Sequence, residues 1–108
     1  MRTEIPPGTL YLLILKSLNR LGPMHGYGIA QHIHQMSEDV LQVEEGSLYP
    51  ALQRMLVKGW IADEWRQTEN KRRARYYRLT ALGKKQLSIE MSEFERVMRA
   101  ISNVIQPA

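Results

Sequence analysis

An apolar seam near the end of the chain restricts the fold more than any other feature. Its residues follow one another at intervals of four, three, four, three and four, and they are Leu87, Met91, Phe94, Met98, Ile101 and Ile105. This spacing is the heptad pattern with which helices pack along one another. A single helix leaves such a seam in water, so the seam needs a partner. We therefore predict a long helix over residues 81–108 that forms a homodimer with a second copy of the chain.

Apolar spacing upstream of the seam predicts three shorter helices. The stretch 9–21 is apolar on nearly every side and must be covered on more than one face. A second, amphipathic helix is expected at about 27–36. The third is expected to begin near Ser47, whose hydroxyl suits an N-cap, with Pro50 in its first turn, and to end at Gly59.

A β-hairpin is predicted after the third helix. Residues 60–66 and 73–79 are rich in β-branched and aromatic side chains and flank a polar stretch. Thr80 is then expected to cap the last helix. The predicted fold class is mainly α with a small β-hairpin (α+β). It consists of a winged helix-turn-helix over residues 1–80 and a C-terminal dimerisation helix over residues 81–108, packed as one compact unit.

The composition fits one globular domain and excludes several classes of protein. Of the 108 residues, 44% are hydrophobic and 24% are charged, as in ordinary water-soluble domains. The chain has no cysteine, which excludes disulfides, thiolate zinc sites and a cysteine nucleophile. The longest apolar run, residues 10–15, is far shorter than the roughly 20 residues of a membrane span. We expect a cytoplasmic protein with no membrane segment.

The positive charge is concentrated in the predicted hairpin. The whole chain carries a formal net charge of +4, whereas residues 66–78 hold six basic residues and one acid. In a winged helix-turn-helix the third helix enters the major groove and the hairpin contacts the neighbouring backbone, so these cations favour double-stranded DNA as the partner. The alternative is a winged-helix module that acts mainly in protein interaction and has little DNA affinity. Such a module has no need for this charge.

Four segments resemble the PadR family of bacterial transcriptional regulators in residues, order and spacing. They are HGYGIAQHI (25–33), EGSLYPALQRM (45–55), KGWIADEW (58–65) and RARYYRLTALGKKQL (73–87). The resemblance covers residues 8 to about 94. The chain differs from many relatives at Met55 and Leu56, where Leu-Glu is common, and at Asn70 and Lys71, where the wing tip is usually rich in glycine.

The resemblance implies a repressor that dimerises through its C-terminal helix and often responds to a small molecule or a stress signal. Regulators of this size commonly act on neighbouring genes, and a two-fold dimer implies an inverted-repeat operator. The start of the third helix would touch bases and phosphates, the second helix would face the backbone, and the hairpin would supply the wing cations. The predicted DNA-binding residues are Tyr27, Ser47, Tyr49, Pro50, Arg54, Lys71, Arg72, Arg73 and Arg75.

We expect any small aromatic effector to bind at the dimer interface, between the C-terminal helices and the first helix. Phe94 lies in the middle of the seam, with Met91 and Met98 one turn away on either side. Thioether side chains adapt to varied shapes, and a space between helices is a common place for a ligand. The simpler interpretation is that all three are ordinary seam residues.

The sequence contains no constellation that indicates catalysis. His25, His32 and His34 do not share one helix face, so they do not form a metal site. Gly26 and Gly28 lack the third glycine and the preceding strand of a dinucleotide-binding loop. We expect no enzymatic activity, no cofactor and no metal.

Two further expectations concern the packing of the hairpin. Arg78 is expected to pair with Glu64 across the hairpin and is therefore left out of the DNA-binding set. Trp60 and Trp65 are expected to pack under the wing rather than to serve as stacking platforms.

Overall fold

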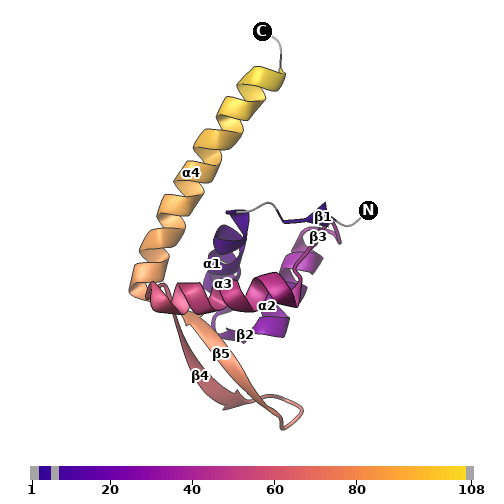
Figure 1. The fold of residues 1–108 in the computed structure, drawn as a ribbon, viewed down its shortest axis with the longest axis vertical. Coiled ribbons are helices and arrows are strands. Elements are labelled where there is room, and N and C mark those ends of the chain that lie inside the picture. The colour runs from indigo at the N-terminus through magenta and orange to yellow at the C-terminus, as the bar shows by residue number, and fades with distance from the viewer. Residues whose placement is uncertain (1–2, 6–7, 107–108) are drawn as a thin grey trace.

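The computed structural model describes residues 3–5 and 8–106, which form four helices and two small sheets (Figure 1). The predicted order of three helices, a hairpin and a long last helix is confirmed. In chain order the elements are β1 (Thr3–Glu4), α1 (Thr9–Leu21), β2 (Met24–His25), α2 (Gly26–Met36), β3 (Leu41–Gln42), α3 (Glu45–Val57), β4 (Ile61–Gln67), β5 (Arg73–Leu79) and α4 (Ala81–Ile105).

Helix α1 lies at the centre of the body, where it contacts α2, α3, α4 and β5. This confirms that it is covered on several faces. Ser17 is buried in the helix, and its hydroxyl donates a hydrogen bond to the carbonyl oxygen of Leu13 at 2.7 Å, which satisfies the buried polar group. The buried apolar residues of α1 are Leu12, Ile14, Leu15 and Leu18.

The spacing of α3 predicts a buried stripe of Leu48, Leu52, Met55 and Leu56. In the structure the first three are buried in the core, and Leu56 is partly buried. The end of α3 is also as predicted, because Gly59 takes a positive φ of 75° that favours glycine. The amide of Gly59 donates to the Leu56 carbonyl at 3.0 Å, and the next amide in the chain donates to the Met55 carbonyl at 3.1 Å. This pair of bonds is a Schellman motif.

The start of α3 corrects two expectations. The helix begins at Glu45, its N-cap is Glu44, and no side chain caps it. Ser47 therefore lies inside the first turn, where its amide donates to the Glu44 carbonyl at 3.0 Å. Pro50 lies in the second turn rather than the first, so the helix lacks the bond that residue 50 would donate to the Gly46 carbonyl. The wrong boundary arose because Ser47 has the residue type of an N-cap, whereas the helix starts without one.

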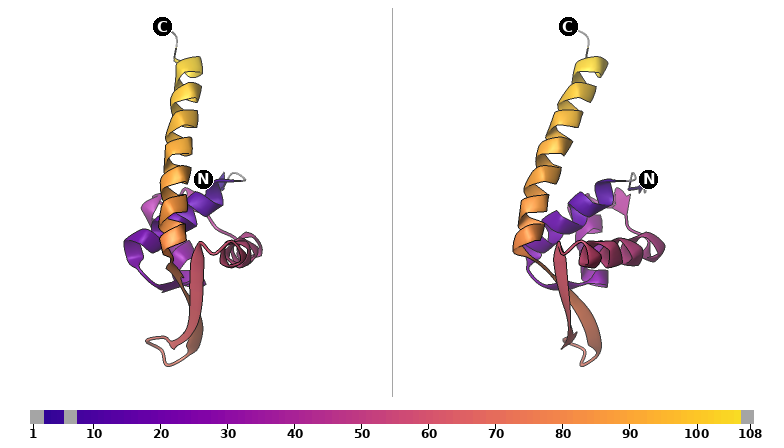
Figure 2. Two further views of the ribbon diagram at one scale, coloured as in Figure 1. Left: turned by 90° about the vertical axis from the view of Figure 1, so that its left-hand side faces the viewer. Right: turned by 60° about the vertical axis from the view of Figure 1, so that its left-hand side comes forward.

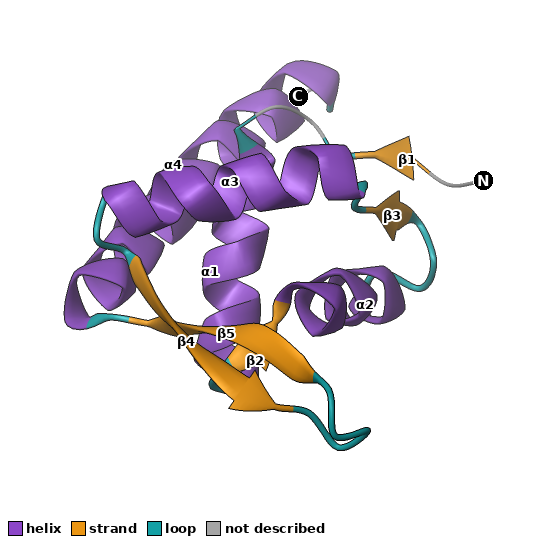
Figure 3. Cartoon of the chain, turned by 60° about the horizontal axis from the view of Figure 1, so that its bottom comes forward, coloured by secondary structure: helices purple, strands orange, loops and turns teal. Residues whose placement is uncertain are grey.

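The hairpin of β4 and β5 belongs to a three-stranded antiparallel sheet in the order β2, β5, β4. Successive tyrosines on β5 point to opposite faces, so Tyr77 is buried in the core while Tyr76 is only partly covered. The short strand β2 was not predicted. It places the chain just before α2 against the middle of β5, as Figure 3 shows.

Helix α4 starts on the body and then leaves it (Figures 1 and 2). Thr80 caps it as predicted, because its hydroxyl oxygen accepts a hydrogen bond from the Gly83 amide at 3.0 Å. Gly83 is buried against the backbone, and a β-carbon there would overlap the Trp60 carbonyl oxygen. Leu87 is buried and Met91 is partly covered, but the seam is exposed from Phe94 onward.

None of the helices in the described ranges combines the length and the apolar character needed to cross a bilayer.

Candidate nucleic-acid interface

Helices α2 and α3 and the β4–β5 hairpin frame one side of the molecule (Figure 3). Between them lies an open hollow of about 580 Å³. Aromatic and cationic side chains from all three elements line it, and they include Tyr27, Tyr49, Trp65, Arg72, Arg73 and Arg75. The hollow therefore combines positive charge with flat, partly apolar surfaces.

Ion pairs reduce the number of free cations on the hairpin. Residues 61–79 hold six basic residues and three acids. Arg75 Nε lies 2.5 Å from Asp63 Oδ2, and Arg66 forms an ion pair with Glu64 on its own strand. Within the described residues no ion pair involves the tip cations Lys71, Arg72 and Arg73, or Arg78. The charge available to a phosphate backbone is thus concentrated at the tip.

The expected pair between Arg78 and Glu64 is wrong. In the register of the hairpin, Arg78 lies opposite Ala62 and Glu64 lies opposite Tyr76. The Glu64 carboxylate accepts instead from Arg66 Nε at 2.8 Å, because residues two apart share one face of a strand. Arg78 is an exposed cation at the base of the wing.

The two tryptophans differ in their surroundings. Trp60 packs as expected, with its ring edge-to-face against Tyr11 at a centroid distance of 5.5 Å. Trp65 does not pack under the wing, since its side chain is 59% exposed on the part of β4 that extends beyond the body. The guanidinium groups of Arg73 and Arg75 lie 5.5 Å and 6.0 Å from the centre of its ring. Cation–π contacts of this kind contribute about 0.5–1 kcal/mol each at exposed sites and hold the arginines in place.

Tyr49 stands at the inner edge of the hollow. It is exposed, and a β-carbon on Gly26 would lie only 2.9 Å from its hydroxyl oxygen, so glycine at that position lets the ring approach α2. Tyr77 lies behind it in the core. Burial raises the pKa of the Tyr77 hydroxyl, while the neighbouring Arg75 guanidinium opposes the rise. An exposed tyrosine and a buried one therefore both line the hollow.

The start of α2 forms the third wall of the hollow. His25 caps the helix, because its Nδ1 accepts a hydrogen bond from the Gly28 amide at 2.9 Å. This bond requires Nδ1 to be unprotonated, so the neutral ring carries its proton on Nε2. The His25 ring also stacks beside Tyr27, which is 68% exposed at the mouth of the hollow.

The structure brings most of the predicted DNA-binding residues together, but not all of them. Tyr27, Tyr49, Arg72, Arg73 and Arg75 line the hollow. Lys71 belongs to the adjoining wing tip, where it adopts a positive φ of 60° and its amide donates to the Thr68 carbonyl at 2.9 Å.

Two residues of α3 lie away from this group. Arg54 Nε donates to the Tyr11 hydroxyl at 2.5 Å, and its guanidinium lies 5.7 Å from the centre of that ring. Ser47 lines a separate recess of about 90 Å³ with Ile5 and Val43. With about 100° of rotation per residue, both lie on the side of α3 remote from Tyr49.

Sequence reasoning also missed two residues that line the hollow and two exposed residues of α3 that do not. His25 and Trp65 line the hollow, and Gln53 and Val57 are exposed on α3 beside Pro50. The rotation of about 100° per residue, applied to the buried stripe, identifies the α3 pair. The exposed position of Trp65 could not be predicted, because it depends on how far the hairpin extends beyond the body.

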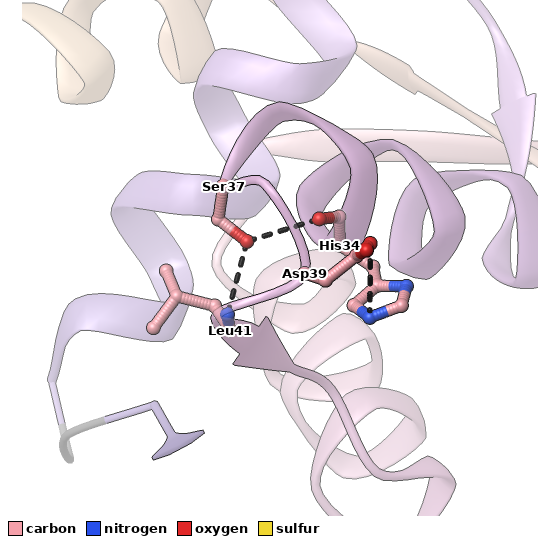
Figure 4. A network of polar contacts seen from close by, with 4 residues as sticks. All are labelled: His34, Ser37, Asp39 and Leu41. Carbon is pink, nitrogen blue, oxygen red and sulfur yellow. Dashed lines mark hydrogen bonds and ion pairs between the residues drawn. The ribbon is translucent and has the colours of Figure 1, made fainter. Parts of the chain in front are cut away.

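The polar contacts around His34 belong to a turn rather than to a binding site (Figure 4). The Ser37 hydroxyl donates to the His34 carbonyl at 3.1 Å and accepts from the Leu41 amide at 3.0 Å. His34 Nε2 lies 3.5 Å from Asp39 Oδ1, which is an ion-pair distance too long for a close hydrogen bond. Glu38 and Asp39 both have positive φ, so these contacts hold a tight turn between α2 and β3. Among the described residues no group of three acidic or histidine side chains is arranged to hold a metal ion.

The helix-turn-helix, the cationic hairpin and the hollow between them define a class, the winged-helix DNA-binding transcriptional regulators. Within that class, the chain belongs to the transcriptional regulator PadR-like family, whose family model matches residues 14–89. The members of this family are transcriptional regulators and not enzymes.

The chain is also similar to individual proteins in sequence and in structure. An uncharacterized protein of Lysinibacillus sphaericus is 31% identical over 101 residues, which cover 94% of this chain and 92% of that protein. A transcriptional regulator from Clostridium thermocellum superposes with a TM-score of 0.83 at 28% identity, over 92% of this chain and 95% of that one. A PadR family transcription regulator from Clostridium difficile gives a TM-score of 0.77 at 30% identity, over 92% of this chain and all of that one.

Proposed function

We propose that this regulator is a homodimeric repressor that binds an inverted-repeat operator next to the genes it controls, in the cytoplasm. One observation carries the proposal. Tyr49 of α3 lines the same hollow as Arg72 and Arg73 of the wing tip, which form no ion pair within the described residues. This arrangement suits a protein that holds a groove and its phosphate backbone together. In this proposal residues 1–80 bind DNA and residues 81–108 form the dimer.

The exposed seam supports the dimer. The outer part of α4 extends away from the body (Figure 2). The seam side chains on this part, from Phe94 onward, are exposed. A second copy of the same helix would remove them from water, with a gain of about 25 cal/mol for each Å² of apolar surface. The seam residues of the proposed interface are Leu87, Met91, Phe94, Met98, Ile101 and Ile105.

We also propose that a small aromatic effector releases the repressor from DNA. Phe94 and Met98 are exposed in the single chain and Met91 is partly covered, so a dimer would enclose all three beside one another. A ligand at this position acts only if it prefers a dimer geometry in which the recognition helices no longer match the operator.

The salt dependence of binding to duplex DNA tests the proposed function. If three or four cations of each wing neutralise one phosphate each, the logarithm of the binding constant falls with the logarithm of salt concentration with a slope of about −5 to −7 for the dimer. Exchanging Lys71, Arg72 and Arg73 for glutamine should move that slope toward zero and weaken binding to all sequences alike. Wild-type protein with a slope near zero would contradict DNA binding and would favour the protein-interaction module.

A matched control removes the same charge elsewhere. Lys16, Arg20 and Lys85 are exposed on α1 and α4, away from the hollow. Their exchange for glutamine changes the net charge equally and should leave the slope within about one unit of wild type. An equal change in both triple variants would mean that overall charge, and not the wing tip, attracts DNA.

A further inference from the structure

The side of α3 opposite its buried stripe carries a row of exposed residues, and none of them belongs to the wing. With about 100° per residue, the direction opposite Leu48, Ala51, Leu52 and Met55 falls between Pro50 and Gln53, with Gly46 and Val57 on the same line. These outward residues are all exposed, and Val57 is 84% exposed. They form the strip of α3 that lies farthest from the body.

Gln53 is the polar side chain of this strip that is free to read a base. Within residues 3–5 and 8–106, no hydrogen bond or ion pair engages its amide. The neighbouring polar groups of α3 are placed elsewhere. Arg54 donates to Tyr11, and Tyr49 packs over Gly26 toward the wing.

The chemistry of this strip matches one base pair better than the others. A carboxamide presents a donor and an acceptor side by side, which fits N6 and N7 of adenine in the major groove. Pro50, three residues earlier, and Val57, four residues later, provide apolar surface on either side of Gln53. Apolar side chains favour the methyl group of thymine.

We propose that Gln53 reads an adenine of an A·T base pair at one symmetric position in each half-site, with Pro50 and Val57 against thymine methyl groups beside it. The inference rests on the proposed function, because it requires that α3 enters the major groove. It assigns base specificity to the outward strip of α3, whereas the wing tip supplies contacts that do not depend on sequence.

Selection from a random duplex library tests this assignment. Wild-type protein should enrich an inverted repeat with A·T at one position in each half-site. Gln53→Arg should change the preference at that position to G·C, because arginine pairs with O6 and N7 of guanine. Gln53→Ala should remove the preference there and weaken binding to the wild-type site by about 5- to 150-fold, with a smaller loss on random DNA.

Gln35→Ala provides the matched control, since Gln35 is an exposed glutamine on α2 and does not line the hollow. It should select the wild-type sequence. Gln53 variants that select an unchanged sequence, or that lose affinity equally on all sequences, would overturn the assignment while leaving the proposed function intact. Wild-type protein that enriches no sequence would overturn the proposed function and this inference together.

Discussion

The body of the molecule and the outer part of α4 contain the same kind of helical apolar pattern, but it is buried in the body and exposed on α4. In the body, the stripe of α3 is fully buried because α1 and the sheet cover it. Along α4 the repeat continues unchanged in sequence, but only Leu87 and Met91 reach the core. Helical spacing therefore identifies the apolar face of a helix. Whether the same chain can bury that face depends on whether the helix is short enough to stay on the body, as α3 is, or extends past it, as α4 does.

A charge placed in the seam should produce the largest effect. Ile101→Asp would bury two unpaired carboxylates in the proposed dimer, each at a cost of about 3–5 kcal/mol. We expect monomers that bind operator DNA poorly but keep a folded body, because Ile101 touches none of the buried core. Light scattering gives the mass, and circular dichroism monitors the fold.

Asn103→Asp adds the same charge on the far side of α4 and should remain dimeric. If the wild-type protein is monomeric at micromolar concentration, the seam is not a dimer interface and this prediction is wrong.

Truncation in the body should have the next largest effect, and on folding rather than on assembly. Leu52→Ala removes a fully buried side chain and should lower the free energy of unfolding by about 2–5 kcal/mol, measured in urea at fixed protein concentration. Val57→Ala on the exposed side of the same helix should change it by less than about 0.5 kcal/mol. Equal losses would show that the two sides of α3 are not distinguished by burial.

The smallest effect is expected at the joint between the two regions. Thr80→Ala removes the N-cap of α4 and the hydrogen bond that the Thr80 hydroxyl donates to the Gly59 carbonyl at 2.7 Å. We expect a loss of about 0.5–2 kcal/mol in unfolding free energy. Thr80→Ser keeps both bonds and should recover most of the loss. If Thr80→Ser lowers the unfolding free energy as much as Thr80→Ala does, the stability comes from the threonine methyl group and not from the cap.

The sequence predicted those parts of the fold that depend on local chemistry. The stripe of α3, the end at Gly59 and the cap at Thr80 each follow from residue types within a few positions of one another. The start of α3 did not follow, because the helix begins at Glu45 without a side-chain cap. The two-residue strand β2 is too short to leave a periodic pattern of its own.

The candidate site was predictable in its composition but not in its geometry. The concentration of cations indicated the wing, yet the ion pair between Arg75 and Asp63 depends on a strand register that the sequence does not reveal. The exposure of Trp65 depends on how far the hairpin extends beyond the body. Arg54 was assigned to DNA by its position in the motif, whereas its side chain donates to Tyr11 on another helix.

The tight packing of Gly83 on the Trp60 carbonyl makes the start of α4 a stiff joint. The helix acts as a lever whose 25 residues span about 37 Å, so a tilt of about 5° at the joint moves its far end by about 3 Å. That displacement is close to the rise of about 3.4 Å between stacked bases along one DNA strand. In the proposed dimer, the angle at this joint would therefore set the distance between the two DNA-binding bodies to within about one base-pair step.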